Sequence, residues 1–182
     1  MKAGEYFERL EQRLEAVVAT GIVHQAALPV HTMVVERIFG RGQKATGAIG
    51  RYSTKPFYAG AVQFAKHTAL NAKGKSGKTV FKNGKPHKTM YLPQGYKQLK
   101  ETQGLEGGFV NLTYTASLKN DFATSLVSSG GMAVSGFNNQ ADIEKAEALK
   151  KKYGNDLFAL TDGELKLFAT ETGRRLTGFL FK

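Results

Sequence analysis

The apolar residues near the start of the chain recur at spacings of three and four, the period of an amphipathic helix. This pattern predicts a helix over residues 4–20, which Gly21 would end as its C-cap. A second helix is predicted over residues 29–39, because proline is tolerated in a first turn and Gly40 would stop the helix. The two apolar stripes are expected to consist of Phe7, Leu10, Leu14 and Val17, and of Val30, Met33, Val34 and Ile38.

The middle of the chain loses this period and predicts loops and hairpins. Glycines between residues 40 and 60 indicate a long surface loop with one short strand at most. Residues 73–92 predict a β-hairpin, because Asn83-Gly84 is a strong signal for a tight turn. A second hairpin is predicted with arms at residues 125–127 and 132–137 around the turn Ser128-Ser129-Gly130-Gly131. Short helices are expected at residues 61–70 and 95–100.

Two further helices are predicted near the C-terminus. The first spans residues 141–153, with Asn138 and Asn139 available as N-caps. The last begins at a capping box in which Thr161 and Glu164 each bond a free backbone amide of the other. The inner faces are expected to hold Ile143, Ala146, Leu149 and Tyr153, and Leu165, Phe168, Thr172 and Leu176.

This order of elements predicts an α+β fold, an antiparallel sheet of hairpins packed by N-terminal and C-terminal helices, with long Gly-rich loops and a basic hairpin. A chain of 182 residues is most simply one domain over residues 1–182, with residues 66–91 as an inserted basic hairpin.

The charge of the chain is unevenly distributed along its length. Fourteen lysines and arginines lie between Glu36 and Glu101, and no acidic residue does. The whole chain carries a net charge of +11, so its excess positive charge belongs to this window. Such a surface attracts polyanions, because each cation near a phosphate releases condensed counterions.

Composition excludes several classes of function. The chain has no cysteine, which excludes disulfides, thiol catalysis and thiolate zinc sites. Its four histidines form no metal-binding spacing, so we expect neither a metal nor a cofactor. No window approaches the roughly 18 apolar residues of a membrane span, and the charged N-terminus does not resemble a signal peptide. We therefore expect that the protein contacts no membrane and that it lies inside a cell or in a particle assembled in a cytoplasm.

Residues 72–79, Ala-Lys-Gly-Lys-Ser-Gly-Lys-Thr, fit a loose form of the nucleotide-binding loop. That loop needs a buried strand before it and a helix directly after it. The preceding residues here look helical and the following ones run into a tight turn, so we interpret the match as a by-product of a loop rich in glycine and lysine.

The lysines of this hairpin allow two interpretations. The hairpin can be an arm that contacts nucleic acid, with Phe81 and Tyr91 as stacking groups, or a solvated edge whose lysines prevent aggregation. Any nucleic-acid contact would be to the backbone and not specific for sequence. The candidate residues for contact with a polyanion or a partner are Lys73, Lys75, Lys78, Lys82, Lys85 and Lys88.

No pattern in the chain indicates catalysis. The sequence has no Gly-x-Ser-x-Gly elbow, and no histidine neighbours Ser117, Ser125, Ser128 or Ser129. Asp121 and Asp156 read as isolated carboxylates, which are solvated side chains far more often than general bases. We therefore expect a protein that is not an enzyme.

Three stretches of the sequence together resemble the small tail-completion (head–tail joining) proteins of tailed bacteriophages. The first comprises Glu36-Arg37-Ile38-Phe39 and Ile49-Gly50-Arg51-Tyr52-Ser53. The second comprises residues 95–100 and 110–118. The third comprises Val134-Ser135-Gly136-Phe137, Lys145-Ala146, Lys152-Tyr153-Gly154, Phe158-Ala159-Leu160-Thr161 and Glu164. Two features depart from the family, since Ala116 stands where it often has glycine and residues 66–91 look added.

The resemblance implies a virion structural protein without catalysis, assembled in the host cytoplasm. Such proteins form a homo-oligomeric ring between the portal or connector and the tail, and the genome passes through its centre. The implied partners are other copies of the chain, portal and tail proteins, and genomic DNA contacted non-specifically in the lumen. The competing hypothesis is a free, non-specific nucleic-acid-binding module that uses the hairpin at residues 73–91.

Overall fold

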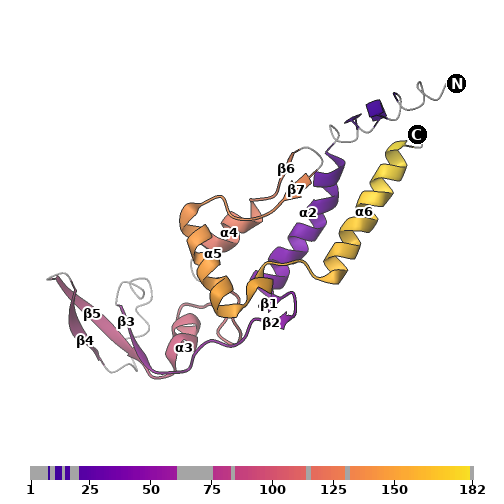
Figure 1. Cartoon of the computed structure of the whole chain (residues 1–182). Helices are drawn as coiled ribbons and strands as arrows, with labels where there is room; N and C mark the ends of the chain where they lie inside the picture. The colour runs from indigo at the N-terminus through magenta and orange to yellow at the C-terminus, as the bar shows by residue number, and fades with distance from the viewer. Residues whose placement is uncertain are drawn as a thin grey trace. The chain divides into compact units, whose positions relative to one another are not determined.

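The computed structural model describes residues 8, 11–13, 15–16, 21–60, 76–82, 85–113, 116–129 and 132–180. The chain divides into two compact units, one formed by Met1–Ala48 with Thr115–Lys182 and the other by Ile49–Tyr114. Helices are combined with small antiparallel sheets, so the α+β class is confirmed (Figure 1). The single domain expected over residues 1–182 stays a prediction.

The long helix α2, Ile22–Val35, forms the centre of the first unit. It begins seven residues before the predicted start, and Pro29 lies inside it. Proline removes one helical hydrogen bond, but burial of Ile22, Ala26 and Ala27 favours continuing the helix through it. Gly21 precedes the helix in a left-handed conformation, φ +67°. The helix expected over residues 4–20 lies largely outside the described residues, although residues 8, 11–13 and 15–16 are helical.

A π-helix, η1 at Glu36–Gly40, continues α2 and ends where Gly40 was expected to end a helix. Its wider turn buries three successive residues, Arg37, Ile38 and Phe39. The two-residue strands β1, Gln43–Lys44, and β2, Gly47–Ala48, follow and pair antiparallel.

The rest of the first unit packs around α2. It comprises α4 (Ser117–Ala123), β6 (Val127–Ser129), β7 (Met132–Val134), α5 (Gln140–Tyr153), the 3-10 helix η4 (Asn155–Leu157) and α6 (Asp162–Leu180). In Figure 1, α6 runs alongside α2, in agreement with the contacts between these helices. β6 and β7 pair antiparallel, as the second predicted hairpin required, but each has only three residues.

The second unit contains a three-stranded sheet in the order β3-β5-β4. Its strands are β3 (Phe57–Gly60), β4 (Ser76–Lys82) and β5 (Lys85–Leu92), and α3 (Gly95–Thr102) follows. β4 and β5 pair antiparallel where the basic hairpin was predicted. Ala59, Leu92 and Leu99 form the core of this unit. The tight turn at residues 83–84 and the helix expected over residues 61–70 lie outside the described residues.

Several predicted inner faces were only partly right. Val30, Val34, Ile38 and Ala146 are buried as expected, but Met33, Ile143 and Leu165 are exposed. On α5 and α6 the buried positions instead include Asp142 and Glu164, which have partners on other elements. Residues 109–113 form no strand.

Candidate functional site

The candidate contact lysines lie in and before the β4–β5 hairpin. Lys78 and Lys82 are on β4, Lys85 is on β5, and the register places Lys82 opposite Lys85. Lys88 is also on β5 and lies opposite Thr79. Lys73 and Lys75 fall outside the described residues. The register therefore places two lysine positions directly opposite each other on neighbouring strands.

The same segment settles the interpretation of residues 72–79. Ser76–Lys82 is a strand, whereas a nucleotide-binding loop requires a helix directly after its last hydroxyl residue. The match to that motif is therefore a by-product of composition, as expected.

The net charges of the two compact units differ strongly. Residues 49–114 hold 11 lysines and arginines against 2 acidic residues, a net charge of +9. The other unit holds 15 basic and 13 acidic residues, a net charge of +2. The second unit therefore supplies nearly all the field that would attract a polyanion.

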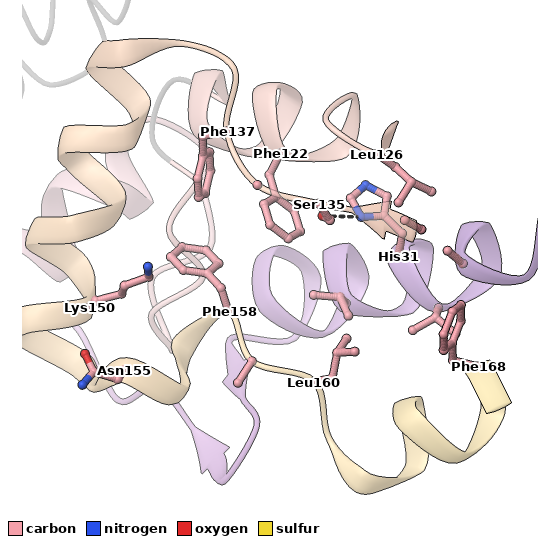
Figure 2. Close-up of a pocket in the computed structure, with 16 residues that line it drawn as sticks. His31, Phe122, Leu126, Ser135, Phe137, Lys150, Asn155, Phe158, Leu160 and Phe168 are labelled. Atoms are coloured by element: carbon pink, nitrogen blue, oxygen red, sulfur yellow. Dashed lines mark hydrogen bonds between the residues drawn. The ribbon is translucent and has the colours of Figure 1, made fainter. Parts of the chain in front are cut away.

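The first unit contains a cavity of about 500 Å³ with an aromatic lining. Phe122 is its centre: its ring centroid lies 5.2 Å from that of Phe137, 5.6 Å from that of Phe158 and 5.2 Å from that of His31. Figure 2 shows these rings together, with Phe168 of α6 further along the lining. We call this feature the aromatic cavity. Among the described residues that line it, Lys150 is the one lysine or arginine and none is acidic.

A Ser–His pair lies on the wall of the aromatic cavity. Ser135 Oγ is 2.8 Å from His31 Nδ1, and His31 Nε2 is 3.2 Å from the carbonyl oxygen of Ala123 (Figure 2). A backbone carbonyl, in place of a carboxylate, thus orients the His31 ring, which fits a structural chain of hydrogen bonds between α2, α4 and the segment directly after β7. Sequence reasoning missed this pair, because the two residues are 104 positions apart.

Arg37 and Glu164 form a buried ion pair that ties η1 to α6. Arg37 Nε lies 2.8 Å from Glu164 Oε1, and Arg37 Nη2 also donates to the carbonyl of Ala159 at 2.7 Å. Glu164 completes the predicted capping box, accepting from Thr161 N at 2.7 Å. Burial acts to raise the pKa of the Glu164 carboxyl, but the hydrogen bonds from Arg37 and Thr161 outweigh it and hold the pKa below its ordinary value.

The aspartates read as isolated from the sequence have partners in the structure. Asp156 accepts from Thr46 Oγ1 at 2.5 Å and from Lys44 Nζ at 3.1 Å, and these bonds lower the pKa of its carboxyl. Asp121 accepts from the backbone amides of Asn138 and Asn139. The interpretation of these two carboxylates as isolated was therefore wrong, because partners distant in sequence bond both of them.

Lys100 is a fully buried lysine in the second unit. Its Nζ donates to the carbonyl of Thr113, lies 3.5 Å from Asn111 Oδ1 and sits 5.2 Å from the centroid of the Tyr52 ring. Burial lowers its pKa, and the charge of Glu106 partly opposes this shift. These contacts join α3 to the segments around residues 52 and 111.

The β6–β7 ribbon carries an exposed apolar surface. The register pairs Val127 with Val134 and Ser129 with Met132, so Val127, Met132 and Val134 share one face. Their exposed fractions are 57%, 66% and 57%, which is unusual for three neighbouring large apolar residues. We call this surface the ribbon face. It lies within residues 122–141, twenty consecutive residues without a single charge.

The described part of the chain shows no cluster of three or more His, Asp or Glu side chains suited to a metal ion. Among the same residues, none of the helices combines the length and the apolar character needed to cross a membrane.

Comparisons of the chain with protein-family models, with curated proteins and with solved structures gave no match.

Proposed function

We propose that this chain is a non-enzymatic structural protein of a tailed-bacteriophage virion. In this proposal it forms a homo-oligomeric ring at the neck and joins the portal or connector to the tail. The observation that carries the proposal is the ribbon face: three exposed apolar side chains on a two-stranded ribbon within an uncharged stretch of twenty residues. Depletion of charge at an exposed apolar surface is typical of the centre of a protein–protein interface.

A backbone feature supports the family resemblance. Ala116 has φ +60°, the left-handed conformation in which glycine is the favoured residue, and it precedes α4 as its N-cap residue. The tail-completion proteins that the sequence resembles often have glycine at this position. If alanine replaced an ancestral glycine here and the backbone conformation was kept, the result would be an alanine with a positive φ, as Ala116 has.

The charge distribution supports a place beside the genome. The second unit, at +9, presents the cationic surface, whereas the first unit, at +2, carries the ribbon face. Assembly and attraction of DNA would thus rely on different parts of the chain.

The proposal is tested by measuring the mass of the full-length chain by light scattering over a range of concentrations, with and without portal particles of the same phage. We expect a closed ring of defined mass that docks on the portal, and cryo-EM of assembled particles should place it between the portal and the tail. A chain that stays monomeric with the portal present, and is missing from tailed particles, would contradict the proposal.

The alternative function is a free, non-specific nucleic-acid-binding module. The like-charged pair Lys82 and Lys85 and the +9 charge of the second unit favour it. A stable monomer that binds duplex DNA with a steep salt dependence would support this alternative. Deleting residues 73–91 separates the two roles of the hairpin, because unchanged DNA retention would assign it to protein contacts.

A further inference from the structure

We infer that the ribbon face of one copy docks into the aromatic cavity of the next copy. This inference rests on the proposed ring and names the surfaces that would build it. Both surfaces belong to the first unit.

The ribbon cannot fill the cavity of its own copy. Ala133 of β7 lines the cavity, whereas Met132 and Val134, its neighbours in the strand, lie on the opposite face. The ribbon is therefore a wall of the cavity, with Ala133 on the inner side and the ribbon face turned away from it. A two-stranded ribbon is only marginally stable by itself, and covering its outer face would stabilise it.

The cavity presents a matching apolar surface. Leu160 lines it and is 40% exposed, so apolar surface is accessible at its opening. Phe158 and Phe168 add aromatic side chains from the segments on either side of Leu160. A flexible thioether such as that of Met132 adapts well to an aromatic surface of this kind.

A second copy is the occupant that these observations favour. Each copy carries an exposed apolar face and a cavity with an apolar lining, and none of the described residues of either surface is acidic. Because the two surfaces are different, their contact is head-to-tail and leaves one of each free at the ends of any open chain. Repetition of that contact gives a ring when the rotation between copies closes and an open filament when it does not, whereas a two-fold contact would stop at a dimer.

The absence of cysteine from the chain makes the contact directly testable by cross-linking. Met132→Cys and Leu160→Cys place one thiol on each surface, and both positions are exposed in the folded unit. With a short bis-maleimide, we expect no covalent dimer from either variant alone and one covalent dimer from their mixture. The double variant should give a ladder of covalent multimers that ends at the size of the ring.

A second pair of variants tests the contact without a cross-linking reagent. Met132→Asp should weaken self-association on the order of tenfold or more, because it would bury an unpaired charge. Ile143→Asp is the matched control, since Ile143 is an exposed apolar residue on α5 that does not line the cavity. It should assemble normally, and circular dichroism should show that both variants fold.

The outcomes separate this inference from the proposed function. A ring that forms without the mixed cross-link, or that survives Met132→Asp, overturns the docking contact and leaves the ring in place. A covalent dimer from Met132→Cys alone indicates a two-fold contact and also overturns it. A chain that stays monomeric with and without portal particles defeats both. If the ribbon face instead binds another virion protein, Met132→Asp should abolish that binding while self-association is unchanged.

Discussion

Among the described ion pairs, Arg37 and Glu164 form the most hydrogen bonds, both with each other and with neighbouring backbone groups. Glu164 accepts from Arg37 and from the amide of Thr161, and its exposed fraction is 3%. Glu164→Ala would leave the guanidinium buried without its carboxylate, so we expect a loss of about 3–5 kcal/mol in unfolding free energy. Denaturant unfolding measures this loss. Glu171→Ala, in a more exposed pair with Arg174, should change stability much less, and equal losses would contradict the assigned role of the buried pair.

The same pair predicts a dependence of stability on acid. The pKa of Glu164 is lowered in the folded protein, so the unfolded chain binds the proton more readily. The stabilisation is therefore complete above the ordinary pKa of about 4.3 and is lost as pH falls through the lower folded value. We expect melting temperature to fall on acidification below that pH. Glu164→Gln should show a shallower fall, and an identical pH profile would contradict this assignment.

At Ala116 we expect a substitution to raise the stability of the protein and not to lower it. Because its φ of +60° suits glycine, Ala116→Gly should raise the unfolding free energy, by up to about 1 kcal/mol. Ala141→Gly is the control: Ala141 lies in the first turn of α5, where glycine should lower stability by up to about 1 kcal/mol. Thermal unfolding of the two variants compares them, and a loss of stability from Ala116→Gly would contradict the strain argued for this residue.

At the scale of single residues, the sequence predicted the contacts between residues that are close together in the chain. The capping box of Thr161 and Glu164 could be predicted because both partners lie within four residues and follow a known pattern. The partner of Glu164 could not, since Arg37 is 127 positions away and only the packing of η1 against α6 brings it near. Charged residues on a helix read as solvent-facing unless such a distant partner is known.

Among the elements, α3 depends on a close approach to the backbone before it. Gly95 has φ +67°, and a Cβ there would come within 2.5 Å of the carbonyl oxygen of Ser53. Gly104 has a similar φ of +70°, but its surroundings are open. Both alanine variants share the cost of the left-handed backbone, about 1–2 kcal/mol. Gly95→Ala should lose a further 1–3 kcal/mol or so from the clash, measured by denaturant unfolding, and equal losses would contradict the packing described.

The sequence predicted where helices occur better than it predicted their first residues and their buried faces. Proline rules favour a start at Pro29, but the apolar residues before it pack in the first unit and extend α2 back to Ile22. The faces of α5 and α6 were misjudged for a related reason. Burial of Asp142 and Glu164 depends on Ser117 and Arg37, so counting apolar side chains favoured Ile143 and Leu165 instead.

Considered as a whole, the chain has most of its net positive charge in one compact unit and the ribbon face in the other. The acid-free window was visible in the sequence, and it coincides largely with the second unit. The ribbon face was not visible, because Val127, Met132 and Val134 read as ordinary strand residues that a sheet would bury. The aromatic cavity was equally hidden, since its lining comes from segments between Ala27 and Phe168.

This separation predicts where a polyanion binds. Lys78→Gln, Lys82→Gln and Lys85→Gln together should reduce the salt dependence of duplex binding, lowering the slope of log K against log salt by up to about 2.7. The matched control removes three lysines of the first unit, Lys151, Lys152 and Lys166, for the same change in net charge. If the field of the second unit governs binding, the control slope stays near that of the unaltered chain. Equal effects would mean that total charge, not its location in the hairpin, attracts the polyanion.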